Sequence, residues 1–265
     1  MRTALTIAGS DPGGGAGIQA DLKTFAAFGV YGTSAVTALT AQNTTGVAGV
    51  AAMSADFVTL QIETIAGDIA LHATKVGMLA TAAIVEAVAA TIAELDLPLV
   101  VVDPVMVSST GERLLENDAV QTLRAELLPR ARVVTPNLPE AEALSGRRIR
   151  SAADARDAAK RIQDMGPRAV IITGGHAPIP NPHSLITDVL LDDHEWHEFE
   201  VDRVDAPPLH GTGCTYASAV AAGLALGRDL AEAARDAQQY VAGAIRHAAP
   251  LGRGRVPLNH FWRLY

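Results

Sequence analysis

Short apolar runs alternate with longer segments of helical periodicity along most of the chain. Residues 99–102 are aliphatic throughout, which is typical of a strand that is covered on both faces. Residues 82–95 instead place Ile84, Val88 and Ile92 on one helical face. The same patterns predict strands at residues 4–8, 31–39, 74–79, 99–102, 132–135 and 169–173, and helices at 16–28, 55–66, 82–95, 118–127, 151–165 and 229–247.

Two segments of the C-terminal half interrupt this alternation. Residues 187–191 and 195–201 alternate in polarity around a polar turn, which predicts an antiparallel hairpin. Residues 216–226 are small and apolar and predict a buried helix. Strands that alternate with helices indicate an α/β fold with a mainly parallel central sheet and helices on both faces. We find no linker-like segment and no internal repeat, so we expect a single domain over residues 1–265.

Composition narrows the class of protein. Aromatic residues make up only 4% of the 265 residues and the formal net charge is −8, so we expect no nucleic-acid partner. The most apolar runs are interrupted by charge and fall short of the roughly 20 residues that a membrane span needs. One cysteine cannot form an intramolecular disulfide, and the N-terminal segment has no long apolar region typical of a signal peptide. We therefore expect a cytoplasmic protein with no membrane partner.

Residues able to do chemistry follow the expected strands. They are residues 9–17, 42–45, 103, 137 and 174–176. The carboxyl ends of parallel strands meet at one edge of a sheet, and ligands bind there in open sheets of this kind. We expect these residues to converge.

Residues 210–215, with the sequence HGTGCT, precede the small-residue helix. Their glycines let backbone N–H groups crowd together at a helix N-terminus, which is a place where anions bind. A thiol is ionised most easily at such a terminus, so Cys214 is a candidate reactive group in phosphate chemistry. A Cys–His pair with His210 or His176 is conceivable, but helix starts carry structural cysteines just as often.

Three other features are open to two interpretations each. Residues 9–17 are either a phosphate cradle or a tight turn, and they match neither a Walker A loop nor a dinucleotide fingerprint. Asp103 ends an aliphatic strand and either binds Mg²⁺ or caps a turn. Glu140 lies in the first turn of a helix that Pro139 opens, where a carboxylate is favourable in any case. The histidines show no metal-ligand spacing with the cysteine, so no zinc site is expected.

Taken together, these segments resemble the hydroxymethylpyrimidine/phosphomethylpyrimidine kinases of thiamine biosynthesis, which belong to the ribokinase-like superfamily. The matching segments are residues 6–25, 37–47, 75–79, 101–115, 135–144 and 210–215. The resemblance implies a ribokinase-like three-layer sandwich and a kinase that uses ATP and Mg²⁺. It also implies an aminopyrimidine alcohol as substrate and a homodimer.

The resemblance further implies roles for individual residues. Gln42 would hydrogen-bond the pyrimidine, since an amide offers a donor and an acceptor together. Cys214 would be the general base, where most ribokinase relatives have an aspartate. The pocket implied for the pyrimidine also includes Gly9, Ala16, Asp21 and Met78. The side implied for the metal ion and the phosphates includes Asp103, Asn137 and Glu140. The implied anion hole is formed by the backbone of Gly211, Thr212 and Gly213.

Two positions depart from the family pattern. Thr173 stands on the ATP side where the family usually has a lysine, and Leu209 replaces a threonine. Residues 176–186 are proline-rich and are expected to form a flap over the nucleotide. The alternatives to the pyrimidine kinase are a pyridoxal/pyridoxine kinase and a non-catalytic pyrimidine-binding module.

Overall fold

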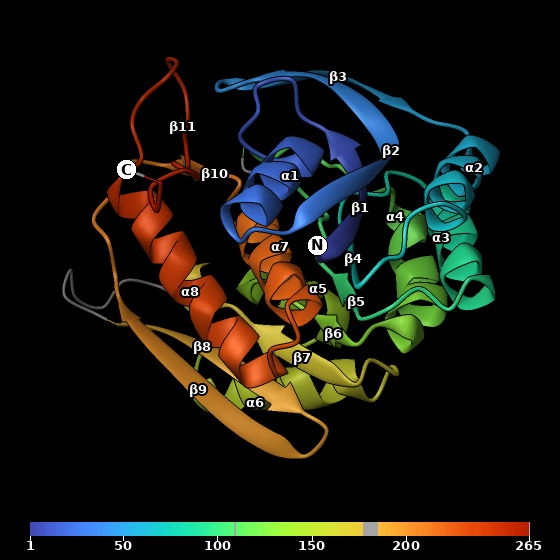
Figure 1. Cartoon of the computed structure of the whole chain (residues 1–265). Coiled ribbons are helices and arrows are strands. Elements are labelled where there is room, and N and C mark those ends of the chain that lie inside the picture. The colour runs from blue at the N-terminus through green and yellow to red at the C-terminus, as the bar shows by residue number, and fades with distance from the viewer. Residues whose placement is uncertain (109, 177–184, 265) are drawn as a thin grey trace.

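A nine-stranded sheet forms the centre of the computed structural model, which describes residues 1–108, 110–176 and 185–264 (Figure 1). Within these ranges the strand order is β3-β2-β1-β4-β5-β6-β7-β8-β9. A short parallel pair lies apart from this sheet, between β10 (Leu209–His210) and β11 (Val256–Pro257). The bounds of the nine strands are β1 Thr3–Ser10, β2 Tyr31–Asn43, β3 Gly46–Ala52, β4 Ala73–Val76, β5 Val100–Val102, β6 Val133–Val134, β7 Ala169–Ile172, β8 Leu185–Asp192 and β9 Glu195–Asp202.

The sheet is parallel in its centre and antiparallel at both edges. Strands β2, β1, β4, β5, β6 and β7 run parallel to one another. Strand β3 is antiparallel to β2, and the β8–β9 hairpin is antiparallel to β7. The mainly parallel sheet and the hairpin expected from residues 187–201 are both confirmed.

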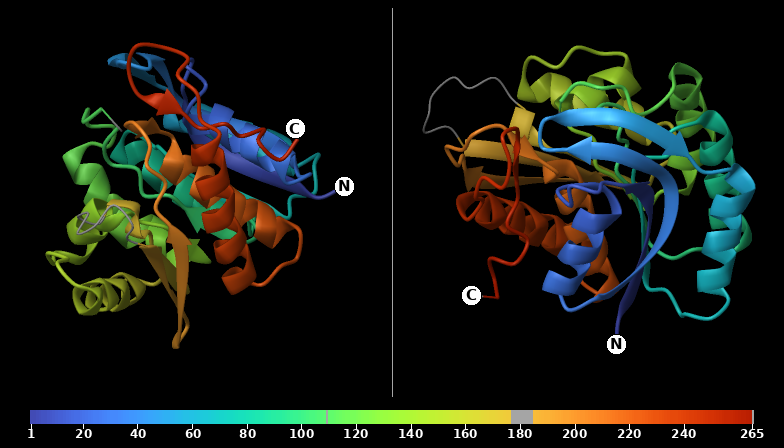
Figure 2. Two further views of the ribbon diagram at one scale, coloured as in Figure 1. Left: turned by 90° about the vertical axis from the view of Figure 1, so that its left-hand side faces the viewer. Right: turned by 90° about the horizontal axis from the view of Figure 1, so that it is seen from above.

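Helices cover both faces of the sheet (Figures 1 and 2). On one face lie α1 (Gly17–Ala27), α7 (Thr212–Ala225) and α8 (Leu230–Arg246). Val101 packs into the core on this side, whereas its neighbours Val100 and Val102 pack on the other, because successive strand residues point to opposite faces. The helices of the other face are α2 (Ala55–Ala66), α3 (Ala82–Glu94), α4 (Asn117–Thr122), α5 (Leu138–Ser145) and α6 (Ala152–Gln163).

This arrangement confirms the expected three-layer α/β sandwich with a mainly parallel sheet. Two covered faces explain why β5 is aliphatic throughout. The helix expected at 118–127 is α4 followed by a π-helical turn, Leu123–Leu127, and a 3₁₀ turn, Leu128–Arg130, that contains Pro129. No helix among the described residues is long and apolar enough to cross a membrane.

The structure differs from the sequence-based expectation in three places. Strand β3 was not expected, because its sequence GVAGVAA combines two glycines with alanines and most of its residues are exposed. Helix α7 begins at Thr212, so Gly213 and Cys214 belong to its first turn rather than to a preceding loop. Of the expected flap, residues 177–184 lie outside the described residues, while His176 ends a 3₁₀ turn, Gly174–His176.

Candidate active site

The residues that follow the parallel strands meet at one edge of the sheet, as expected. Gly77 donates its backbone N–H to Ile7 at 2.9 Å, and Asp103 donates its own to Val76 at 2.8 Å. Thr135 continues this series by donating to Val102 at 2.9 Å. Neighbouring strands therefore end in step, and the loops after them lie at the same edge of the sheet.

Helix α7 presents a free N-terminus at this edge. Its N-cap, Gly211, has a φ of +87°, and a Cβ added there would lie 1.8 Å from the carbonyl oxygen of Gly15. Only glycine fits both constraints. The backbone N–H of Thr215 is the first to bond inside the helix, to Gly211 at 3.0 Å. The N–H groups of residues 212–214 therefore have no partner within the helix, and a helix end of this kind can bind an anion.

Lys75 forms a buried charge cluster behind this helix end. Its side chain has no exposed surface, and Nζ lies 3.1 Å from Oδ2 of Asp21 and 3.8 Å from Oδ2 of Asp103. Although burial opposes its charge, the negative groups around it raise the pKa of Lys75 above its ordinary value. The cluster thus holds a permanent cation next to Asp103.

Asp21 belongs to this cluster and not to the surface of the ligand pocket. It is fully buried, and besides Lys75 it accepts hydrogen bonds from Thr6 at 2.6 Å and from Ser218 at 2.7 Å. Both carboxylate oxygens are therefore occupied by protein groups. In this arrangement Asp21 anchors Lys75, and its expected contact with the substrate stays a prediction.

Asp103 and Glu140 provide carboxylates suited to a metal ion. Asp103 is buried, and its Oδ2 has no hydrogen-bond partner among the described residues. Burial raises the pKa of Asp103 to about 6, although the Lys75 ammonium opposes this. Burial and repulsion from Asp103 raise the pKa of Glu140 to about 8. Two carboxylates that are unfavourable when charged, one with an orphaned oxygen, fit a site that a divalent cation completes.

No group of three or more side chains suited to hold a metal is present among the described residues. A Mg²⁺ ion is compatible with this, since it is bound by one or two carboxylates together with waters and substrate phosphates. Glu140 is held in place by a capping box at the start of α5: Asn137 N–H donates to Glu140, and Glu140 N–H donates to the Asn137 side chain, each at 3.0 Å. The helix-cap interpretation of Glu140 is thus confirmed and leaves its second oxygen for other partners.

Cys214 is a half-buried residue whose thiol points inward and donates a hydrogen bond to Asp103. Burial raises the pKa of Cys214 to about 12, even though the Lys75 cation favours the thiolate. The expectation that the helix N-terminus makes this thiol easy to ionise is therefore wrong for the free protein. Desolvation and the nearby carboxylates outweigh the effect of the lysine on this thiol.

The first glycine loop is occupied by a carboxylate of the protein itself. Asp11 accepts backbone N–H groups from Gly13 at 2.8 Å and from Gly15 and Ala16 at 2.9 Å. N–H groups that would bind a phosphate in a cradle are thus already bonded. A Cβ added to Gly15 would lie 2.5 Å from the His210 ring, so the loop is built for close contact with residues 210–211. Of the two interpretations left open above, the tight turn holds.

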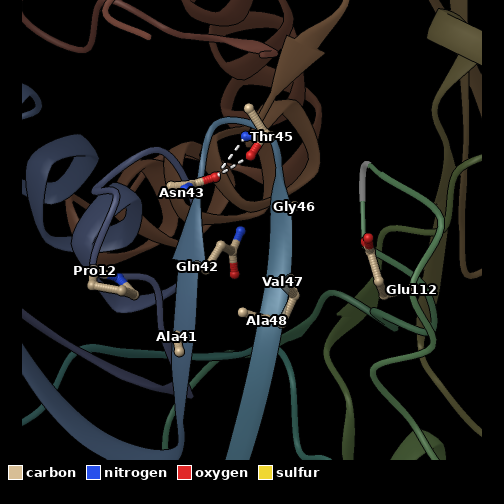
Figure 3. A pocket seen from close by; sticks show the side chains of 9 residues that line it. All are labelled: Pro12, Ala41, Gln42, Asn43, Thr45, Gly46, Val47, Ala48 and Glu112. Carbon is tan, nitrogen blue, oxygen red and sulfur yellow. Dashed lines mark hydrogen bonds between the residues drawn. The ribbon is translucent and has the colours of Figure 1, made fainter. Parts of the chain in front are cut away.

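Gln42 lies near the end of β2 and lines a cavity of about 590 Å³ between the β2–β3 hairpin and the loop that carries Glu112 (Figure 3). Glu112 receives hydrogen bonds from Ser108 and Thr110, which hold its pKa below the usual range. The other residues that line the cavity are Pro12, Ala41, Asn43, Thr45, Gly46, Val47 and Ala48.

Gly9 and Met78 are neighbours deeper in the sheet edge. A Cβ on Gly9 would lie 3.0 Å from the Met78 sulfur. Met78 is almost fully buried, and neither residue lines the cavity that contains Gln42. Ala16 does not line that cavity either, and its backbone N–H is one of the groups that donate to Asp11.

Thr173 lies beside the start of α5. Its N–H donates to Pro136 at 3.0 Å, and it pairs with Asn137 in a parallel bridge. The following Gly174 donates to buried Asp188 at 2.8 Å. Asn137, Glu140 and Thr173 therefore lie close together at the start of α5.

The role of Lys75 and two contacts of His210 could not be predicted from the sequence analysis. Lys75 was passed over as part of a short strand, although a lysine within a buried strand is itself a signal, because such a charge needs partners. Asp11 and His210 are linked at 3.0 Å across the two glycine motifs, and His210 lies 3.2 Å from the Gln42 amide. Neither contact has a local sequence signal, since the partners are far apart along the chain.

Comparisons with known proteins agree with this geometry. Residues 11–259 match the family described as phosphomethylpyrimidine kinase. The hydroxymethylpyrimidine/phosphomethylpyrimidine kinase of Synechococcus elongatus is 48% identical over 262 residues, covering 99% of this chain and 98% of the relative. A thiamine biosynthesis bifunctional protein of Geobacter sulfurreducens is 46% identical over 97% of this chain, which spans about half (51%) of that longer protein.

Among solved structures, an ADP complex of Bacillus subtilis pyridoxal kinase superposes with a TM-score of 0.89 at 40% identity, covering 100% of both chains. This similarity confirms the fold over the whole chain. With a family match over most of the sequence and a near full-length relative at 48% identity, the chain belongs to the phosphomethylpyrimidine kinase family of phosphotransferases.

Proposed function

We propose that this chain phosphorylates the hydroxymethyl group of 4-amino-5-hydroxymethyl-2-methylpyrimidine with ATP, and then the monophosphate to the diphosphate, for thiamine biosynthesis. The observation that carries the proposal is the junction at His210. Its ring lies 3.2 Å from the Gln42 amide, and the next residue is the N-cap of α7. A heterocycle at Gln42 and an anion at the helix end are thereby bound by adjoining parts of the chain.

The backbone of Gly211, Thr212 and Gly213 serves as the anion hole in this proposal. Its N–H groups stabilise the negative charge of the migrating phosphoryl group, and each well-placed donor is worth a few kcal/mol, about 3. Since they lie at the start of a helix packed in the core, they need no rearrangement when charge develops.

Cys214 is the proposed proton acceptor for the attacking hydroxyl. Its pKa of about 12 in the free protein means that the thiol must first lose its proton. In phosphoryl transfer the transition state is loose and the demand on a base is modest. The proposed role therefore depends on how ligand charges alter the balance between Lys75, Asp103 and Cys214.

Asp103 and Glu140 are the residues that would hold Mg²⁺, with Asn137 fixing Glu140. A bound Mg²⁺ would neutralise charge on the nucleotide phosphates. Thr173 and Asn137 form the proposed ATP side. Without the lysine usual at position 173, the cation nearest to Asp103 is Lys75, which is buried and committed to Asp21.

A second candidate substrate is pyridoxal, favoured by the similarity to a pyridoxal kinase. ADP release is measured with each alcohol and the products are identified by mass spectrometry. We expect turnover of the aminopyrimidine to its monophosphate and diphosphate. Turnover of pyridoxal alone would reject the first choice, and binding of the pyrimidine without turnover would indicate the non-catalytic binding module.

A homodimer and a cytoplasmic location remain proposals. Strand β3 is an edge strand whose residues are mostly exposed. An edge strand offers unpaired backbone groups to another chain, which supports association of two copies there. Light scattering is expected to give twice the mass of the chain, and a monomer at micromolar concentration would contradict the proposal.

A further inference from the structure

The side chain of Gln42 lies between two groups that restrict how its amide can be oriented. In the structure the amide nitrogen lies 3.2 Å from Nε2 of His210, and the amide oxygen lies 3.2 Å from Oγ1 of Thr40. Rotation of the amide by half a turn exchanges these atoms with little change in shape, so the hydrogen-bond partners decide which atom lies where.

His210 cannot accept a hydrogen bond from Gln42, because Nε2 of its ring carries the proton that it shares with Asp11. Oδ2 of Asp11 lies 3.0 Å from Nε2 of His210 and also accepts the N–H groups of Gly15 and Ala16 at 2.9 Å. Burial opposes the charge of Asp11, but these hydrogen bonds hold its pKa below the ordinary value, so the carboxyl is ionised. An ionised carboxylate only accepts, and Nε2 of His210 therefore carries a proton, whether the ring is neutral or charged.

Thr40 is an acceptor toward Gln42 because its single hydroxyl proton is already used. Oγ1 of Thr40 donates to the carbonyl oxygen of Ser10 at 3.0 Å. Toward the amide at 3.2 Å it can only accept. Both neighbours thus give the same result: the oxygen of the Gln42 amide belongs beside His210, and its nitrogen belongs beside Thr40. The opposite orientation sets two N–H donors against each other.

We propose that Asp11, His210 and Thr40 lock the Gln42 amide in this orientation and so make the site selective for the order of donor and acceptor on a heterocycle edge. The remaining oxygen lone pair, on the His210 side, accepts from an amino group. The remaining N–H, on the Thr40 side, donates to a ring nitrogen. This inference rests on the proposed function, since it takes Gln42 as the residue that binds the ring.

A 4-aminopyrimidine offers an amino donor beside a ring-nitrogen acceptor and satisfies both groups of the locked amide. The 4-oxo analogue offers a carbonyl acceptor beside a ring N–H donor, which is the reverse order. A freely rotating glutamine accepts either compound by turning over. The locked glutamine accepts the oxo compound only by breaking its bonds to His210 and Thr40, and sites with unpaired polar groups reject such analogues strongly.

The test compares kcat/KM for 4-amino-5-hydroxymethyl-2-methylpyrimidine and for its 4-oxo analogue. Thr40→Val removes the hydroxyl with little change in shape, and His210→Phe removes Nε2 and keeps a ring. Thr33→Val is the matched control, since Thr33 lies on the same strand and donates to a backbone carbonyl, that of Ala4, at 3.2 Å. We expect the unaltered protein and the control to prefer the amino compound about 100-fold, on the order of two lost hydrogen bonds.

In Thr40→Val and in His210→Phe we expect this preference to fall about tenfold, through a higher KM for the amino compound and a lower one for the oxo compound. In Thr40→Val the kcat for the amino compound should change by less than about threefold, which separates a positioning role from a catalytic one. Calorimetric titration of both compounds gives the same comparison without turnover, and circular dichroism confirms folding.

The outcomes separate the lock from the proposed function. A protein that phosphorylates the aminopyrimidine, but in which Thr40→Val keeps the full preference, retains the proposed function and overturns the lock. A protein that neither binds nor phosphorylates the aminopyrimidine overturns both. If His210→Phe does not fold, Thr40→Val alone decides.

Discussion

Replacing Glu140 by glutamine should make the free protein more stable while it removes activity. Gln is nearly isosteric with Glu and preserves the capping box, because its amide oxygen can still accept the Asn137 N–H. The substitution removes only the charge that burial and Asp103 disfavour. Removal of a functional carboxylate is expected to stabilise the free protein where that charge is unfavourable without the ligand and is kept because the ligand binds to it.

The magnitude follows from the pKa of Glu140, which is raised from 4.5 to about 8. This difference corresponds to at most about 5 kcal/mol, and partial exposure and coupling to Asp103 reduce the expected gain to about 1–3 kcal/mol. The folded state binds a proton that the unfolded chain has already released, so wild-type stability falls as the pH rises from 4.5 to about 8. The variant lacks this loss: the two proteins are equal near pH 4.5 and differ most above pH 8.

Urea unfolding at a series of pH values measures this effect, with kcat/KM measured in parallel. Glu86→Gln on the exposed face of α3 is the control and should change stability by less than about 0.5 kcal/mol. Mg²⁺ with ADP should stabilise the wild type more than Glu140→Gln, because the cation compensates the charge that the variant lacks. Equal or lower stability of the variant above pH 8 would refute the reasoning.

Three further changes probe the same region. Cys214→Ala should lower kcat by about 10²–10⁴-fold while the pyrimidine still binds by calorimetry, and full turnover would show that the thiol is not the base. Lys75→Met should cost about 3–5 kcal/mol in urea unfolding, since it leaves buried carboxylates without their cation, and an unchanged midpoint would contradict the charge cluster. Gly211→Ala should abolish activity in the ADP-release assay, because its Cβ would meet the Gly15 carbonyl at 1.8 Å.

The fold was predictable from sequence where burial alone shapes the pattern. Strands β5 and β7 are buried on both faces, so their unbroken aliphatic runs identified them. Strand β3 left no such signal, because its residues are small and exposed and it is held mainly by pairing with β2. Edge strands that cover a site rather than a core are the part of the sheet that hydrophobic patterning does not reveal.

The sequence identified the residues of the candidate site, but it did not indicate which of them carry a charge in the folded protein. Asp103, Glu140 and Cys214 were found because each follows a strand or starts a helix at the expected sheet edge. The protonation of all three depends on burial. That of Glu140 depends also on Asp103, and that of Asp103 and Cys214 depends also on Lys75, which lies on another strand. A thiol at a helix N-terminus is favoured as thiolate when exposed, but here burial reverses that preference. Local sequence gives no measure of that burial.

The two glycine motifs are best understood as one feature. Gly15 and Gly211 each lack a side chain because the other motif occupies that space: a Cβ on Gly15 would meet the His210 ring at 2.5 Å, and a Cβ on Gly211 would meet the Gly15 carbonyl at 1.8 Å. Asp11 joins them by bonding its own loop and His210 together. A glycine-rich loop beside a helix start usually indicates a phosphate site. Here the carboxylate of Asp11 takes the place of the phosphate in the first motif, so the anion-binding role falls to the second motif, at the start of α7.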